Sequence, residues 1–291
     1  MTFSSKRRWA STFVAPFSLA CAPMGGPAQE PAPVLSSYDL TRPGDRFEMP
    51  GRLDEISGLA ATPDGRLFAH DDERATLHEI DRETGALGKR FSLGDPPIEA
   101  DFEGLAIAGD RFFLITSTGL LFEFREAHDR ETTPHRVTDT GLGGICEAEG
   151  LDYDPRGDEL LVACKVSTPD RGSIVVRRLP LDPARAPLAP IEAARSQLAA
   201  FEVDSDFQAS SIAVSPSGTL VMVSANPETL LEIDRSGRVL AAVDLPGRRH
   251  PQSEGLAFGP DGSLYVSDEQ NDGPAAMVTR YRPASVDGAS R

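Results

Sequence analysis

Five copies of one short unit recur along this chain. Each copy is an apolar segment of the Glu-Gly-Leu-Ala type, followed by a turn such as Pro-Asp-Gly and a second apolar segment. The copies begin at Ser57, Glu103, Glu149, Ser210 and Glu254, at intervals of 46, 46, 61 and 44 residues. A period in the forties with short strands and regular turns is typical of β-propeller blades. The repeat therefore predicts an all-β fold, a five-bladed β-propeller, and a sixth unit is not found in the sequence.

The outer strands of the blades also follow from the sequence. In the first unit, residues 76–80 and 89–93 have the apolar pattern of a third and a fourth strand. The last unit ends after its third strand, residues 277–281, while residues 46–49 precede the first unit without a partner. Pairing these two segments would cover an open sheet edge. We therefore expect the ring to be closed by the N-terminal strand.

The longest interval, between the third and fourth units, contains a different pattern. Good helix formers follow Pro190 over residues 190–200. Proline is favoured in the first turn of a helix. We expect a short helical insertion between blades 3 and 4 that decorates the ring.

Acidic side chains gather at one predicted end of the ring. The first strand of each propeller blade lines the central channel, and residues two apart on a strand share a face. The first position of each repeat and the position two residues earlier therefore form two stacked rings, and the ends of the second strands return to the same mouth. The carboxylates at these positions, our candidate metal ligands, are Glu103, Glu149, Glu254, Glu55, Asp101, Glu147, Asp71, Asp72, Asp268 and Glu269.

Crowded carboxylates repel one another, and a bound cation relieves that repulsion. The candidate ligands are all hard oxygens and the five histidines are scattered singly, so we expect Ca²⁺, with Mg²⁺ less favoured. An ion would be sought first on the axis, among Glu103, Glu149 and Glu254, and second at the seam between the first and last blades. The alternative is structural: a glutamate at the mouth can accept backbone hydrogen bonds and simply tie neighbouring blades together.

The composition restricts the partners. Asp and Glu number 45 against 29 Lys and Arg, which gives a formal charge of −16. Such a surface repels nucleic acid and anionic lipid. We expect no nucleic-acid partner, an unidentified envelope protein or small ligand instead, and a monomer.

The amino terminus has the pattern of an export signal. Residues 6–8 are basic, and the apolar run that follows is too short to span a bilayer. We divide the chain into an export signal (1–22), a flexible tether rich in Pro, Gly and Ala (23–37), the propeller (38–283) and a C-terminal tail (284–291). Ser18-Leu-Ala-Cys21 resembles the lipobox of bacterial lipoproteins, which would make Cys21 a lipid anchor; the alternative is ordinary cleavage a few residues later. Both predict a periplasmic or outer-membrane-anchored protein without a transmembrane segment in the mature chain.

Two further cysteines, Cys146 and Cys164, fall near the same end of one predicted hairpin. An oxidising compartment permits a disulfide between them. Two buried free thiols are the alternative, because the strand register does not follow from the sequence.

Three segments carry a resemblance to a known family. Asp101-Phe-Glu-Gly-Leu105, Glu149-Gly-Leu-Asp-Tyr-Asp-Pro155 and Gln252-Ser-Glu-Gly-Leu-Ala-Phe258, in this order and spacing, resemble the SdiA-regulated family of bacterial exported proteins. The resemblance covers about residues 38–283. It implies a five-bladed propeller with a calcium site, distantly related to NHL-repeat propellers, and no known activity. The glutamate of its motif corresponds to Glu103, Glu149 and Glu254, whereas Ser57 and Ser210 depart from it and argue against an ion held equally by all five blades.

Two classes of function fit these observations. The first is a binding or scaffold module at the cell envelope that contains a structural Ca²⁺. The second is a Ca²⁺-dependent hydrolase, a lactonase, esterase or phosphoesterase, with Lys165, His70 and Asp268 nearest for proton transfer. The sequence has no Gly-x-Ser-x-Gly motif and no cysteine beside an assignable histidine, so the binding module is favoured and no catalytic residue is assigned.

Overall fold

The structure is a computed structural model that describes residue 1 and residues 32–284, except 43, 169, 187 and 271–274. The predicted export signal after Met1, Cys21, residues 23–31 of the tether and residues 285–291 of the tail lie outside the described residues. No helix in the described part of the chain is long and apolar enough to cross a membrane.

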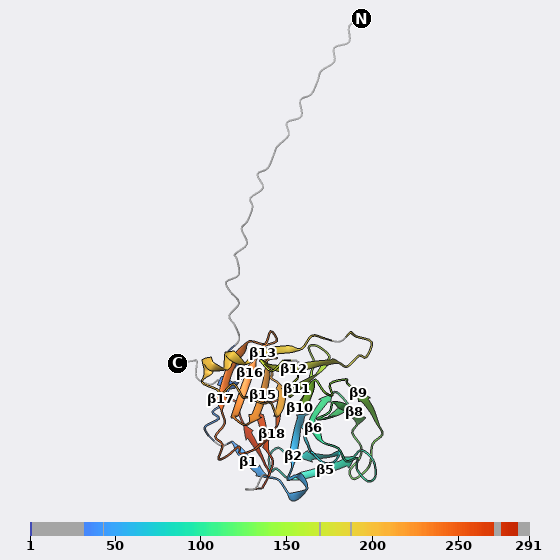
Figure 1. Cartoon of the computed structure of the whole chain (residues 1–291). Helices are drawn as coiled ribbons and strands as arrows, with labels where there is room; N and C mark the ends of the chain where they lie inside the picture. The colour runs from blue at the N-terminus through green and yellow to red at the C-terminus, as the bar shows by residue number, and fades with distance from the viewer. Residues whose placement is uncertain (2–31, 43, 169, 187, 271–274, 285–291) are drawn as a thin grey trace. The chain divides into compact units, whose positions relative to one another are not determined.

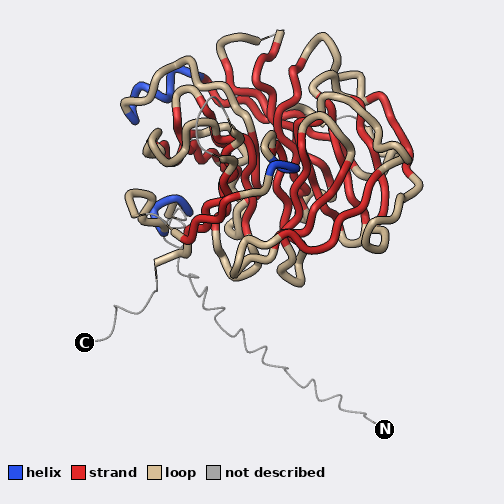
Figure 2. Tube along the Cα trace, turned by 90° about the horizontal axis from the view of Figure 1, so that it is seen from below, coloured by secondary structure: helices blue, strands red, loops and turns tan. Residues whose placement is uncertain are grey.

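Five antiparallel sheets of four strands form the body of the molecule, and the five-bladed β-propeller predicted from the repeat is confirmed (Figures 1 and 2). Blade 1 comprises β2 (Ile56–Ala61), β3 (Leu67–Asp71), β4 (Thr76–Ile80) and β5 (Leu87–Ser92). Blade 2 comprises β6 (Phe102–Ala108), β7 (Arg111–Thr116), β8 (Leu120–Arg125) and β9 (His135–Asp139). Blade 3 comprises β10 (Cys146–Asp154), β11 (Glu159–Ser167), β12 (Ser173–Pro180) and β13 (Ile191–Ala194). Blade 4 comprises β14 (Ser211–Val214), β15 (Leu220–Ala225), β16 (Glu228–Ile233) and β17 (Val239–Asp244). Blade 5 comprises β18 (Ser253–Phe258), β19 (Leu264–Asp268), β20 (Met277–Tyr281) and, as its outer strand, β1 (Asp45–Glu48).

The first strands of the blades form the inner ring. Each of β2, β6, β10, β14 and β18 contacts the next, and β18 contacts β2. The strands approach closely where the repeat has glycine: a Cβ atom at Gly104 would lie 2.6 Å from the Leu151 backbone nitrogen, and one at Gly150 would lie 2.7 Å from that of Ile212. The second position of the repeat is therefore glycine in four blades because a side chain there would collide with the neighbouring blade.

Aromatic side chains fill the space between blades 1 and 2. Phe68 and Phe91 of blade 1 are fully buried against Phe112 of blade 2. The ring centres of Phe68 and Phe112 are 5.2 Å apart, those of Phe91 and Phe112 are 5.9 Å apart, and both pairs meet edge to face. Packing of this kind buries large apolar areas and adds a favourable ring geometry, so the blades are held together by their facing surfaces.

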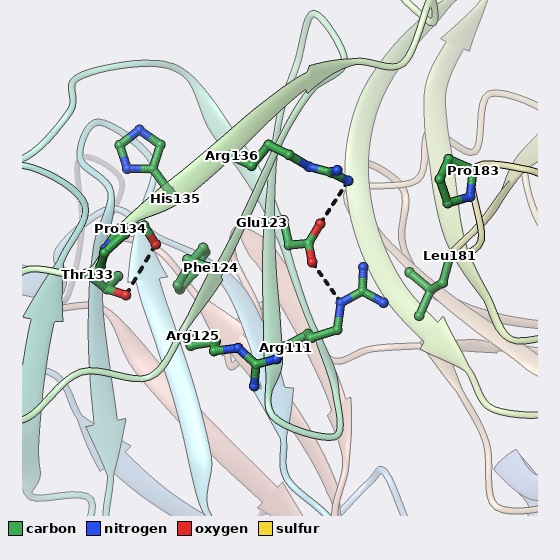
Figure 3. Close-up of a pocket in the computed structure, with 10 residues that line it drawn as sticks. All are labelled: Arg111, Glu123, Phe124, Arg125, Thr133, Pro134, His135, Arg136, Leu181 and Pro183. Atoms are coloured by element: carbon green, nitrogen blue, oxygen red, sulfur yellow. Dashed lines mark hydrogen bonds and ion pairs between the residues drawn. The ribbon is translucent and has the colours of Figure 1, made fainter.

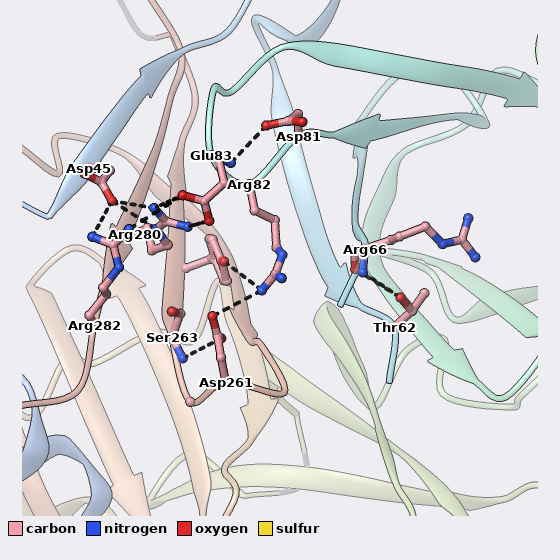
Figure 4. A network of polar contacts seen from close by, with 12 residues as sticks. Asp45, Thr62, Arg66, Asp81, Arg82, Glu83, Asp261, Ser263, Arg280 and Arg282 are labelled. Carbon is pink, nitrogen blue, oxygen red and sulfur yellow. Dashed lines mark hydrogen bonds and ion pairs between the residues drawn. The ribbon is translucent and has the colours of Figure 1, made fainter. Parts of the chain in front are cut away.

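An ion-pair network lies where β1 joins blade 5 (Figure 4). β1 pairs antiparallel with β20, with Phe47 opposite Val278. Arg280 of β20, whose side chain is 2% exposed, donates to Asp45 of β1 at 2.7 Å and to Glu83 of blade 1 at 2.6 Å. One buried guanidinium thus connects the N-terminal strand, the last blade and the first blade.

Residues 190–200 differ from the predicted helical insertion. Residues 191–194 form β13, and a 3₁₀-helix, η3 (Arg195–Phe201), follows. Ile191 and Ala193 are buried whereas Glu192 and Ala194 are exposed. This alternation supplies the outer strand that blade 3 needs, so sheet pairing prevails over the local helix propensity.

The end of the predicted tether also belongs to the folded body. Residues 34–37 form the 3₁₀-helix η1 (Val34–Ser37), and Leu35 is 1% exposed. The backbone N–H groups of Val34 and Leu35 donate to the carboxylate of buried Glu232 at 2.9 and 3.0 Å. A second short 3₁₀-helix, η2 (Gly51–Leu53), precedes blade 1.

A disulfide links Cys146 to Cys164, with their Cα atoms 5.3 Å apart. Of the two alternatives that the sequence left open, the structure contains the disulfide. The ladder between β10 and β11 is irregular around Ala148, the register partner of Cys164, and the two cysteines meet at this irregularity.

Candidate functional site

The inner strands bring the three repeat glutamates to one mouth of the ring. Glu103, Glu149 and Glu254 lie on β6, β10 and β18, and Glu149 is 4% exposed. The other two repeat positions carry serines, which form hydrogen bonds between neighbouring blades. The Ser210 hydroxyl, for example, donates to the Ser253 carbonyl of the next blade at 2.5 Å. The ring is therefore uneven, with its carboxylates on blades 2, 3 and 5.

Burial raises the pKa of all three glutamates. The pKa of Glu254 rises to about 8, because the side chain is desolvated and because Glu269 and Glu149 repel its charge. Burial likewise raises the pKa of Glu103, with Glu149 and Asp101 adding repulsion. A buried cluster of carboxylates with displaced pKa values is a common property of functional sites.

Lys165 supplies one counter-charge at the mouth. Its Nζ lies 3.2 Å from Glu149 Oε1. Burial raises the pKa of Glu149, and the Lys165 charge opposes that rise. Burial disfavours the charged form of Lys165, yet the surrounding carboxylates, Glu149 first, raise its pKa overall. The ammonium therefore remains charged and compensates one of the three glutamates.

The seam between the first and last blades contains a tighter carboxylate group. Glu55, Asp71 and Asp72 each offer one oxygen, and these oxygens all lie within 4.8 Å of one another. Asp72 Oδ1 is buried and has no hydrogen-bond partner among the described residues. Burial raises the pKa of Asp72 to about 7, with Glu55, Asp71 and Glu269 adding repulsion. Burial raises the pKa of Glu269, and the negative charge of Glu55 across the seam raises it further. We call Glu55, Asp71 and Asp72 the seam cluster.

Ligand atoms converge at the seam, the second of the two predicted metal positions. Among the described residues, the seam cluster is the group of three acidic, histidine or cysteine side chains whose ligand atoms converge, and the axial glutamates do not form such a group. The oxygen donors of the seam cluster suit a hard cation such as Ca²⁺, and the unpartnered Asp72 oxygen is a free ligand position. Glu55, Asp71 and Asp72 thus fit the predicted ion better than Glu103, Glu149 and Glu254 do.

Two other candidates lie at the mouth but on the surface. Asp101 is exposed and accepts a hydrogen bond from the Ser117 hydroxyl. Glu147 is exposed one residue beyond the disulfide-linked Cys146. An open pocket of about 650 Å³ extends from Asp72 to Asp101, and Arg74 is one of the residues that line it. The mouth therefore has a solvent-accessible side next to the seam cluster.

Asp268, also predicted as a ligand, is buried in a separate hydrogen-bond network. It is 1% exposed, and its carboxylate binds the Ser253 hydroxyl and His250 Nδ1, both at 2.9 Å. The other ring nitrogen of His250 lies 2.6 Å from the Tyr281 hydroxyl. Sequence reasoning missed this buried network because His250 precedes Asp268 by 18 residues and no local motif joins them. Both carboxylate oxygens of Asp268 are occupied by internal hydrogen bonds, and Asp268 does not belong to the seam cluster.

Fold and site together define a five-bladed β-propeller with an acidic channel mouth. The chain belongs to the SdiA-regulated family, whose model matches residues 37–272. A search of the curated proteins found no significant match.

Several solved structures share the fold. Glutaminyl cyclase from Myxococcus xanthus superposes with a TM-score of 0.59 at 16% identity, over 84% of this chain and 97% of that one. The luciferin-regenerating enzyme superposes with a TM-score of 0.55 at 12% identity, over 85% and 98% of the two chains. The PQQ-bound aldose sugar dehydrogenase from Streptomyces coelicolor has a TM-score of 0.51 at 12% identity, over 83% and 99%. At these identities the likeness extends to the fold alone. The structural neighbours include enzymes of different chemistry, so the fold does not select one activity.

Proposed function

We propose that this protein is an exported, Ca²⁺-binding β-propeller that acts as a binding module at the cell envelope. The observation that carries the proposal is the seam cluster, where three carboxylates converge and a buried oxygen of Asp72 has no partner among the described residues. When bound there, Ca²⁺ would offset two of the three negative charges of Glu55, Asp71 and Asp72. Glu269, from the last blade, lies close enough for its charge to affect Asp72.

The position of the cluster suggests a structural role for the ion. Asp72 joins neighbouring blades through its backbone: its carbonyl accepts from Phe102 of blade 2 at 2.7 Å, and its N–H donates to the Glu55 carbonyl at 3.1 Å. On the other side of the seam, the Gln270 N–H donates to the Asp54 carbonyl at 2.7 Å. Neutralising the carboxylates at this junction would stabilise the contacts among blades 5, 1 and 2, and would leave the exposed loops of the mouth for a partner.

The alternative is a Ca²⁺-dependent hydrolase, and two of the three groups proposed for its proton transfer are buried away from solvent. His70 is fully buried, and burial lowers its pKa to about 4. Asp268 is hydrogen-bonded inside blade 5. Lys165 remains at the mouth, where it pairs with Glu149. Of the three groups considered for proton transfer, Lys165 is thus the one that lies at the mouth, and this favours the binding module.

The proposal is tested by restoring Ca²⁺ to chelator-stripped protein. We expect calorimetry to detect binding and the melting temperature to rise, with a smaller response to Mg²⁺, because a ligand that binds only the folded state stabilises it. Asp72→Asn should abolish this response. Asp206→Asn is the matched control, because Asp206 is exposed and lies in the segment that precedes blade 4.

A melting temperature that does not change when Ca²⁺ is restored would show that the proposal is wrong. An unchanged Ca²⁺ response in Asp72→Asn would exclude the seam cluster as the site. A panel of lactone, ester and phosphoester substrates, assayed with and without Ca²⁺, tests the alternative: Ca²⁺-dependent turnover would favour the hydrolase.

A further inference from the structure

A groove lined by arginines lies between blades 2 and 3, at the end of the blades opposite the carboxylate mouth. Arg111 begins β7 and pairs with Ala108, whereas Phe102, beside the mouth, pairs with Thr116 at the other end of the same ladder. Two adjoining pockets make up this arginine groove, and both are lined by Arg111, Glu123, Arg136, Leu181 and Pro183. Figure 3 shows Glu123 between the two arginines, with Leu181 and Pro183 on the facing side.

The groove has the opposite charge to the molecule as a whole. Of its two pockets, we call the one that reaches Arg178 and Arg185 the inner pocket. Its charged lining residues are four arginines and two carboxylates: Arg111, Arg136, Arg178, Arg185, Glu123 and Asp182. Arg178 is already paired with the buried Glu159 carboxylate at 2.8 Å, so the lining keeps an excess of one positive charge in a chain whose formal charge is −16. A positive groove in an acidic protein selects negatively charged ligands.

The arginines are held in place and are not fully neutralised. Glu123 Oε1 accepts from Arg111 Nε at 2.8 Å, and Glu123 Oε2 accepts from Arg136 Nη2 at 3.1 Å. One carboxylate thus serves two guanidinium groups. The Arg111 guanidinium also lies over the Phe113 ring, 5.0 Å from its centre, which fixes its plane. Among the described residues, the terminal amino groups of Arg111 have no hydrogen-bond acceptor, so they are available to a ligand.

The other side of the inner pocket is apolar. Its volume is about 330 Å³, which is at the lower end of the range for pockets that hold small molecules. Such a size favours a small ligand over a segment of a protein. The apolar side chains that line it are Phe113, Leu121, Leu160, Leu179, Pro180, Leu181 and Pro183.

We propose that the arginine groove binds a small amphipathic anion, a carboxylate attached to a short hydrocarbon chain. Guanidinium groups bind carboxylates through paired N–H donors, and Arg111 and Arg136 present such donors on either side of Glu123. The hydrocarbon chain would lie against Leu179 and Leu181. This site is separate from the carboxylate mouth and does not depend on the function proposed above.

The test uses octanoate as the probe, with two matched controls: acetate retains the charge without the chain, and octanol retains the chain without the charge. Calorimetry on the folded propeller should detect octanoate at millimolar concentration or below, and neither control. Arg111→Met should weaken octanoate binding about tenfold, the usual effect of removing a hydrogen bond to a charged group. Arg42→Met, at a side chain that is 85% exposed and outside the groove, should leave octanoate binding unchanged.

A second variant protects the test against misfolding. Arg136 is 66% exposed, so Arg136→Gln should fold normally and should also weaken octanoate binding. Failure of octanoate to bind at millimolar concentration would overturn the proposal. Equal binding of octanol would show that the arginines do not select an anion, and equal binding of acetate would show that the apolar wall plays no part; either result would overturn it. Unchanged octanoate affinity in a folded Arg111→Met or Arg136→Gln variant would do so as well.

Discussion

Glu254→Gln should make the metal-free protein more stable at neutral pH. The pKa of Glu254 is raised from 4.5 to about 8 by burial and by the neighbouring carboxylates. At pH 7 the unfolded chain has an ionised Glu254, whereas the folded protein keeps this side chain mostly protonated. Holding the proton costs about 3 kcal/mol at pH 7, taken as an upper limit because water and salt screen a side chain that is not fully buried. Glutamine removes this cost, and its amide oxygen can still accept the bond from Gln252 Nε2, which measures 2.7 Å in the wild type.

The sign of the pH dependence follows from the raised pKa. A carboxyl group whose pKa is higher in the folded state stabilises that state fully below the unfolded value of 4.5, and this stability is lost as the pH rises to about 8. The difference between Glu254→Gln and the wild type should therefore be close to zero near pH 4 and should grow up to pH 8. In a chain of this size, each kcal/mol corresponds to roughly 2 to 4 °C in melting temperature.

Urea unfolding in the presence of chelator, at pH values from 4 to 8, measures this difference directly. Glu147→Gln is the control, because Glu147 lies at the same mouth but is exposed, and it should change the unfolding free energy by less than about 0.5 kcal/mol. The reasoning is refuted if metal-free Glu254→Gln is no more stable than the wild type at pH 7 to 8. It is equally refuted if the stabilisation is the same at pH 4, since a proton-linked cost must disappear there.

Three further changes test the fold. Arg280→Met should lower the unfolding free energy by about 1 to 3 kcal/mol, because it removes charge-assisted hydrogen bonds to two carboxylates that are 41% and 71% exposed and stay hydrated. Arg282→Met, at a side chain that is 59% exposed, should cost less than about 1 kcal/mol in the same urea titration. Reduction of the bond between Cys146 and Cys164, which are 18 residues apart, should lower the unfolding free energy by about 3 kcal/mol in the loop-entropy model, and an unchanged denaturation midpoint would contradict that value. Gly104→Ala should lower the melting temperature by several degrees, because its Cβ would lie 2.6 Å from a backbone nitrogen of the next blade. This corresponds to about 1 to 3 kcal/mol of overpacking. A melting temperature equal to that of the wild type would show that the inner strands pack less tightly than described.

The repeat itself determined the architecture. Five copies at a period in the forties predicted five blades, and the strand alternation predicted which residues face the channel, so Glu103, Glu149 and Glu254 lie on the inner strands as expected. These features depend on local periodicity, which the sequence displays directly. The Glu-Gly-Leu segments also carried the family resemblance, and the match to the family model over residues 37–272 confirms it.

The tertiary structure decided which carboxylates meet. Asp71 and Asp268 occupy equivalent ends of second strands, yet Asp71 contributes to the seam cluster while Asp268 turns inward to His250 and Ser253. The difference arises from His250, a residue on a connecting segment that is buried beside one blade and has no counterpart in the other. A repeat alignment compares positions along the strand and contains no information on what a neighbouring loop places next to them.

Contacts between segments far apart in the sequence also explain why the sequence did not reveal the arginine groove or the strand formed by residues 191–194. Arg111, Arg136 and Arg178 belong to two blades and come together only when the blades pack side by side. Residues 191–194 have local helix propensity, but an unpaired edge of blade 3 recruits them as a strand. The sequence by itself determined the number of blades and the faces of their strands, because these follow from periods along one chain. Which side chains meet across blades, and therefore where a cation or an anion can bind, was decided by the packing of segments far apart in the sequence.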